Sequence, residues 1–200
     1  MPLPKGRIKK VEVTKKWFDQ MEHEGKFKPV APPDKSDPPD SLYERAELLL
    51  GVAQLTSGEV IAPLLDHYSI LQQADVEHSH FILTVAGVFM AASRLNNLQL
   101  GDRCEDMLME VVAERMDQWN PDSIQSFEDC KELYEKVHDR LTEAGHEPRF
   151  VASDAVGEWI VRSILKRSPQ TDDEIALVRS TGVEVTAAFF HYWSDILRDI

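Results

Sequence analysis

The chain has 200 residues, of which 42% are hydrophobic and 28% are charged, and its formal net charge is −13. A chain of this length and composition buries a sizeable core, which excludes a wholly disordered or collagen-like protein. A chain with this net negative charge repels phosphate groups, and this repulsion disfavours nucleic acid as its partner.

The first 40 residues differ in composition from the rest. Residues 1–33 hold eight Lys/Arg and four Asp/Glu, a net of +4, whereas residues 34–200 hold fourteen and thirty-one, a net of −17. Seven of the eleven prolines fall before residue 40. We therefore expect a basic arm over residues 1–28 and an extended, proline-rich linker over residues 29–40.

The arm carries an aromatic cluster between its lysines. Thr14 would cap a short helix that presents Trp17, Phe18 and Met21. A helix this short is not stable alone, so its aromatic side chains must pack on the body, on a second copy or on a partner. The opposite charges of arm and body favour docking within one chain, where the effective concentration is high.

From residue 41 onward the apolar spacing is helical, which predicts an all-α domain over residues 41–200 with about seven helices. Gly58 is expected to separate the first two helices. The third is apolar almost all round, which predicts a place at the centre of the core. The expected helices span residues 41–58, 59–73, 75–98, 102–119, 123–144, 153–166 and 172–200.

The last segment repeats apolar residues at alternating steps of three and four from residue 175 to residue 196. It forms either one helix or two helices with a break at Gly182, because glycine costs about 1 kcal/mol inside a helix. This seam lies either in the core of the monomer, which we favour, or between two copies in a homodimer.

One stripe of the expected central helix combines polar ends with small residues. His80, Thr84 and Arg94 are pocket candidates, with Arg94 as an anion clamp and His80 as an acid or base. The simpler interpretation, which we favour, is close helix packing over the small residues. The stripe consists of Glu77, His80, Thr84, Gly87, Ala91 and Arg94.

A second set of residues would support chemistry. Glu44 and Glu47 share a face of the first body helix and, with Glu77, would supply carboxylates to magnesium or manganese. This set resembles the acidic pairs of the all-α nucleotide pyrophosphohydrolases, which implies a small metal-dependent phosphohydrolase. The chain departs from that family at His80, where the family pattern has aspartate. We interpret these carboxylates as a solvated face and expect no catalytic residue, no metal and no cofactor.

The remaining features concern the environment of the protein. Cys104 and Cys130 are too few for a disulfide framework, which predicts a reducing compartment. The longest apolar stretch, residues 81–92, is too short to cross a bilayer. We therefore expect a cytoplasmic protein with no membrane partner.

Together these features predict a non-enzymatic protein-interaction module of the immunity, antitoxin or adaptor type, with an acidic helical body and a basic arm. The expected partner is another protein of basic character, and a second copy is the other arrangement. Desolvated aromatic side chains dominate protein interfaces, and lysines would supply charge. The expected interface residues are Lys15, Lys16, Trp17, Phe18, Phe189, Tyr192 and Trp193.

Overall fold

The computed structural model describes residues 42–71, 74–95, 102–145 and 148–196. Within these ranges the chain is all-helical and has no strand, which confirms the predicted class. The expected arm and linker lie outside the described residues. The elements are α2 (Leu42–His67), the 3-10 helix η1 (Ser69–Leu71), α3 (Val76–Leu95), α4 (Asp102–Trp119), α5 (Ser123–Glu143), α6 (Pro148–Leu165) and α7 (Asp172–Ile196).

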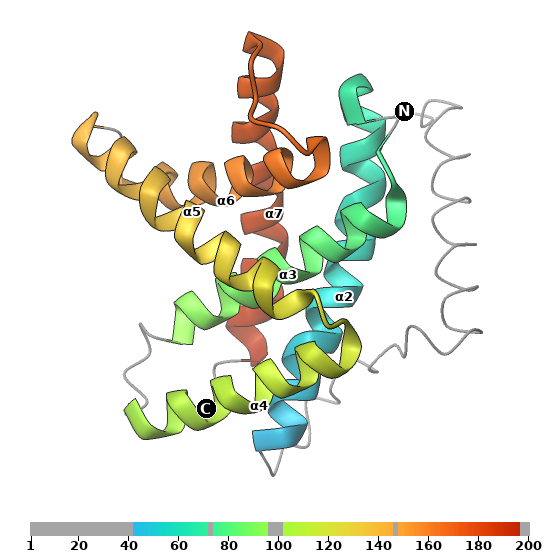
Figure 1. The fold of residues 1–200 in the computed structure, drawn as a ribbon, viewed down its shortest axis with the longest axis vertical. Helices are drawn as coiled ribbons and strands as arrows, with labels where there is room; N and C mark the ends of the chain where they lie inside the picture. The colour runs from blue at the N-terminus through green and yellow to red at the C-terminus, as the bar shows by residue number, and fades with distance from the viewer. Residues whose placement is uncertain (1–41, 72–73, 96–101, 146–147, 197–200) are drawn as a thin grey trace.

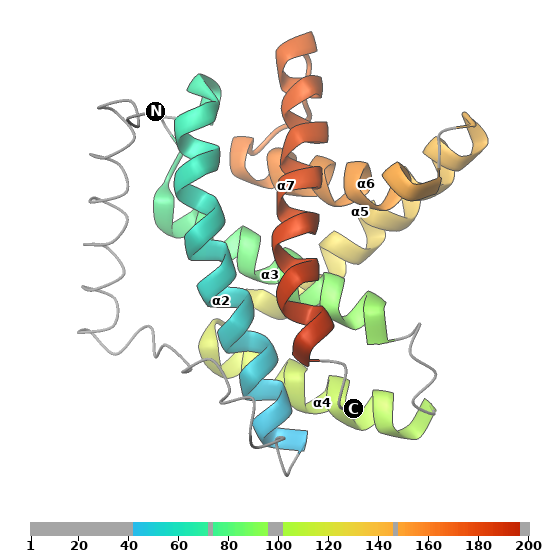
Figure 2. The same cartoon turned by 180° about the vertical axis from the view of Figure 1, so that it is seen from behind.

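Helix α3 lies at the centre of the bundle and contacts α2, α5, α6 and α7 (Figure 1, Figure 2). Residues 82–89 are buried without exception. A helix that is apolar on every side is stable in water only when neighbours cover every side. Asp75 starts the helix, because its Oδ1 accepts hydrogen bonds from the backbone N–H groups of Glu77 (2.9 Å) and His78 (3.2 Å). The predicted central position of this helix is confirmed.

The two helices expected at residues 41–58 and 59–73 are in fact one helix, α2, so the predicted break at Gly58 is wrong. Most of α2 is buried, and it packs against α3, α4 and α7. Burial of this apolar surface outweighs the helix-interior costs of about 1 kcal/mol for Gly58 and about 3 kcal/mol for Pro63. The described residues therefore contain six α-helices where about seven were expected.

Among the described helices, α2 is the one with a segment, Ala46–His67, long and apolar enough to cross a membrane by length and composition. In its most apolar window, 78% of the residues are buried inside the protein. The core helix of a bundle has this same composition, because both environments exclude water.

The ends of the other helices follow local chemistry. Helix α4 ends directly before Asn120, and α5 ends before Gly145, whose φ of +75° is the left-handed conformation that glycine adopts without strain. Helix α6 begins at Pro148, so the helix start expected at residue 153 is wrong. Proline suits a first helical position because its φ is already helical and no N–H is needed there.

Helices α6 and α7 touch backbone to backbone. A Cβ atom added to Gly182 would lie 2.0 Å from the carbonyl oxygen of Ser153, and one added to Gly157 would lie 2.2 Å from that of Val178. Helix α7 runs unbroken through Gly182 as one helix. Gly182 therefore permits this close approach, and packing compensates for its low helix propensity.

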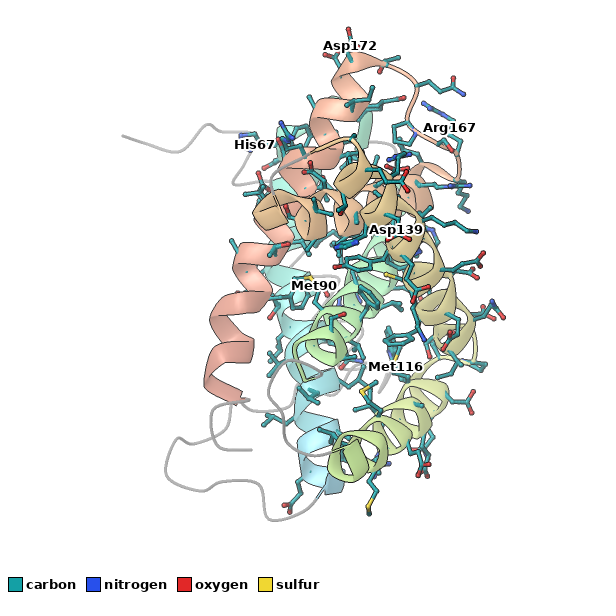
Figure 3. The ribbon with its side chains drawn as sticks, turned by 90° about the vertical axis from the view of Figure 1, so that its left-hand side faces the viewer. His67, Met90, Met116, Asp139, Arg167 and Asp172 are labelled. Atoms are coloured by element: carbon teal, nitrogen blue, oxygen red, sulfur yellow. The ribbon has the colours of Figure 1, made fainter. Side chains whose placement is uncertain are left out.

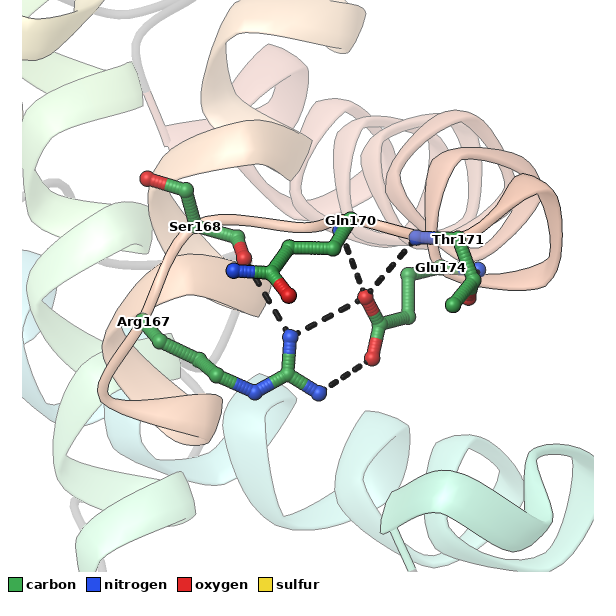
Figure 4. A network of polar contacts seen from close by, with 5 residues as sticks. All are labelled: Arg167, Ser168, Gln170, Thr171 and Glu174. Atoms are coloured by element: carbon green, nitrogen blue, oxygen red, sulfur yellow. Dashed lines mark hydrogen bonds and ion pairs between the residues drawn. The ribbon is translucent and has the colours of Figure 1, made fainter.

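A polar network closes the turn between these two helices (Figure 4). Glu174 is buried and accepts hydrogen bonds from the guanidinium of Arg167 and from the backbone N–H groups of Gln170 (2.6 Å) and Thr171 (3.2 Å). The N–H of Glu174 donates in return to Thr171 Oγ1 at 3.2 Å, which completes a capping box. The Arg167 hydrogen bond is the largest of the effects that lower the pKa of Glu174 to about 2.

We predict that Gly182→Ala destabilises the protein by about 1–3 kcal/mol, because the new methyl group collides with the backbone of α6. Helix propensity alone predicts the opposite sign, a gain of about 1 kcal/mol. Urea unfolding followed by circular dichroism measures the difference. The control is Val183→Ala at the next, exposed position, which should change the free energy of unfolding by less than about 0.5 kcal/mol. Stabilisation by Gly182→Ala would contradict the close contact.

We also predict that Glu174→Gln lowers the melting temperature at pH 7, because the ion pair with Arg167 is lost. The carboxylate has a lowered pKa in the folded state, so its contribution is complete above its ordinary pKa of 4.5 and is lost as the pH falls toward 2. Thermal melts at several pH values should therefore show the gap between variant and unaltered protein closing over that range. A gap that stays constant down to pH 2 would contradict this assignment.

Candidate functional site

The candidate pocket along α3 is closed by α2, in line with the favoured interpretation of close helix packing. His80 is 6% exposed, and its Nε2 lies 3.0 Å from the backbone carbonyl oxygen of Gln54. Thr84 is fully buried and donates to Ser57 Oγ at 3.2 Å, and Ser57 donates to the carbonyl oxygen of Ala53 at 2.6 Å. These contacts form a polar seam between two packed helices. The side chain of the third candidate, Arg94, lies outside the described residues.

The seam holds His80 in its neutral form. A carbonyl oxygen accepts hydrogen bonds, so Nε2 of His80 must carry the proton that it shares with Gln54. Burial lowers the pKa of His80 from 6.5 to about 4, and the hydrogen bond to Gln54 opposes part of this effect. His80 therefore acts as a neutral hydrogen-bond donor that joins α3 to α2.

Further along the same stripe, Gly87 makes room for an aromatic ring. A Cβ atom on Gly87 would lie 2.3 Å from Cε1 of Phe189, which is fully buried. The structure thus places Phe189, an expected interface residue, in the core between α7 and α3. The side chains of Tyr192 and Trp193 lie outside the described residues, as do Lys15, Lys16, Trp17 and Phe18.

The structure does not gather the carboxylates of the alternative magnesium or manganese site. Glu47 Oε1 instead pairs with an Arg115 nitrogen on α4 at 2.9 Å. Glu44 and Glu77 are exposed, at the first turns of α2 and α3. Within residues 42–71, 74–95, 102–145 and 148–196, no group of three or more His, Cys, Asp or Glu side chains is placed to hold a metal ion.

A groove of about 430 Å³ lies between α5 and the end of α6. Lys136 pairs with Glu132, and Arg167 pairs with Glu174. The basic side chains of the groove are Lys136, Arg162, Lys166 and Arg167. Asp129 and Glu132 line the same groove. Among its described lining residues the groove therefore carries charges of both signs, with four basic side chains and two acidic ones.

A second groove, of about 410 Å³, lies between α4 and α5 and is mostly apolar. The two helices diverge from the turn that joins them, and Figure 3 shows Met116 on the side of α4 that faces this angle. Phe127 closes the wall on α5, where its ring packs edge-on against Phe89 of α3, with centroids 5.8 Å apart. The lining residues are Met109, Glu110, Val112, Ala113, Met116, Ile124, Phe127 and Glu128. We call this the α4–α5 groove.

The depth of the α4–α5 groove and the charge of its rim favour an apolar ligand that is flanked by positively charged groups. Val112 and Met116 are each 1% exposed and form the floor, whereas Met109 and Phe127 are half-buried and accessible. Glu110 and Glu128 are the charged residues of the rim, and no Lys or Arg is among the described residues that line the groove. Methionine side chains adapt to varied apolar partners because they are unbranched and polarizable.

The α4 half of this groove was not singled out from the sequence. Met109, Val112, Ala113 and Met116 stand at helical steps of three, one and three, so one apolar face was readable there. That face alone predicts burial, and only the angle between α4 and α5 leaves it open. On α5, which was expected as a helix over residues 123–144, Cys130 and Val137 are buried.

No protein-family model, curated protein or solved structure matches this chain.

We predict that His80→Gln reduces the acid sensitivity of the protein. In the unfolded chain His80 has its ordinary pKa of 6.5, whereas in the folded protein its pKa is about 4. Between these values the unfolded chain binds a proton that the folded protein does not, so the free energy of unfolding falls as the pH drops through this range. Glutamine keeps a donor for Gln54 but does not titrate. The loss of unfolding free energy between pH 7 and pH 4.5, measured in urea, should shrink by about 2–3 kcal/mol in the variant. His138→Gln, at a partly exposed position of α5, is the control for the same replacement elsewhere in the chain. Equal losses in the unaltered protein and in both variants would contradict the prediction.

Proposed function

We propose that this protein is a non-enzymatic, cytoplasmic protein-interaction module that binds a basic amphipathic helix of another protein in the α4–α5 groove. The observation that carries the proposal is the accessible apolar lining of this groove beneath an acidic rim. Helix-in-groove recognition uses apolar anchors from one face of the ligand helix, and flanking charges set its orientation.

The dimensions and chemistry of the groove support this ligand class. Two diverging helices leave a channel whose walls are Met109 on one side and Phe127 on the other. An apolar anchor would fill the channel above Met116, and lysine or arginine beside it would meet Glu110 and Glu128. The acidic body, with a net of −17 over residues 34–200, would speed the approach of such a partner.

We predict that a synthetic amphipathic helix of leucine and lysine binds the full chain, and that Ala113→Arg weakens the binding by about tenfold or more. Ala113 is half-buried in the groove, so an arginine there occupies the channel and repels the lysines of the probe. Calorimetric titration at low ionic strength measures both affinities. The matched control is Ala187→Arg on the exposed face of α7, which adds the same charge away from the groove.

The proposal requires that the two variants differ. Circular dichroism and melting temperature first establish that both are folded. Equal affinities of Ala113→Arg and Ala187→Arg for the probe, or no binding by the unaltered chain, would contradict the proposed function.

A further inference from the structure

We infer that, in the free protein, the chain's own basic arm occupies the α4–α5 groove through Trp17 and Phe18, so that an external helix must displace it. This inference rests on the proposed function, because it assigns an occupant to the same groove. It makes the arm an internal competitor and the groove a regulated site.

The side chains of the arm match those of the groove. Trp17, Phe18 and Met21 stand at the spacing of one face of a short helix, directly after Lys15 and Lys16. The groove offers methionine and phenylalanine side chains, and sulfur–aromatic contacts are favourable. Lysines beside the aromatic anchors would meet a rim that carries glutamates and, among its described residues, no lysine or arginine.

The described chain begins close to the groove. The first turns of α2 lie beside α4 in both Figure 1 and Figure 2, and the pair between Glu47 and Arg115 joins the two helices at 2.9 Å. Arg115 directly precedes Met116, which lines the groove. The arm therefore needs to pass around a single helix to reach the groove.

The linker is long enough for this path. Residues 29–40 would span about 37 Å at the polyproline rise of about 3.1 Å per residue, whereas a helix with its side chains is about 10 Å thick. A tether of this length also keeps the arm at an effective concentration in the millimolar range near the groove. A contact too weak to bind in trans is therefore sufficient in cis.

Photo-cross-linking of the full chain tests this inference. Phe18 is replaced by p-benzoylphenylalanine, which inserts into nearby C–H bonds and reacts readily with methionine, and the products are mapped by mass spectrometry. We expect a product with the mass of one chain, joined to Met109 or Met116. Products joined to other surfaces, a product with the mass of two chains, or no product at all would each overturn the inference.

Charge-neutral variants supply the matched control. Glu110→Gln together with Glu128→Gln should lower the yield of the groove product by about two- to fivefold, because each exposed charge contributes modestly. Glu135→Gln together with Glu143→Gln removes the same charge from exposed positions of α5 outside the groove lining and should leave the yield unchanged. Equal yields from the two double variants would count against the acidic rim as the arm's contact.

A third measurement separates this inference from the proposed function. Trp17→Ala with Phe18→Ala removes the internal competitor, so the leucine–lysine helix should bind that variant at least about threefold more tightly than it binds the unaltered chain. Equal affinities would overturn the arm's role while leaving the groove as a binding site. If neither the unaltered chain nor this variant binds the leucine–lysine helix, while the separate cross-linking experiment at position 18 still yields a product at Met109 or Met116, the proposed function is overturned and the arm's contact stands.

Discussion

The removal of water from every side of α3 is the constraint on which the rest of the structure depends. This helix is apolar around almost its whole circumference, so α2, α5, α6 and α7 must all reach it. They do so where small or polar residues allow it, as at Gly87 beneath Phe189 and at His80 against α2. The glycine contact between α6 and α7 sets how closely the last two helices approach each other on one side of α3.

The α4–α5 groove is a consequence of this arrangement. Helix α5 packs on α3 and α6, while α4 packs on α2, so the two helices diverge from the turn that joins them. Their apolar faces are wider than the contact that they share, and Met109, Ile124 and Phe127 stay partly accessible. Among the described residues, this open apolar channel with an acidic rim sets the α4–α5 face apart from its charged surroundings.

The candidate sites show where residue spacing is informative and where it is not. Spacing placed His80 and Thr84 on one stripe of a helix, and the structure shows that stripe pressed against α2. The same residue spacing occurs on helices that line a pocket and on helices that pack tightly, because spacing defines which side chains share a helix face and does not define which element lies opposite that face. Likewise Glu47 lies on the predicted helix but pairs with Arg115, far along the chain. The α4–α5 groove could not be predicted from spacing within one helix, because it depends on two helices and on the angle between them.

The sequence alone determined the helical class, the central place of α3 and most helix ends, because these follow from apolar periodicity and from local caps such as Asp75 and the Thr171–Glu174 box. Only the tertiary structure decided that α2 continues through Gly58 and α7 through Gly182. A glycine's local cost is about 1 kcal/mol, whereas burial and close packing act across helices that are distant in sequence. Whether a helix breaks, and which apolar face stays open, therefore depends on neighbours that no local pattern specifies.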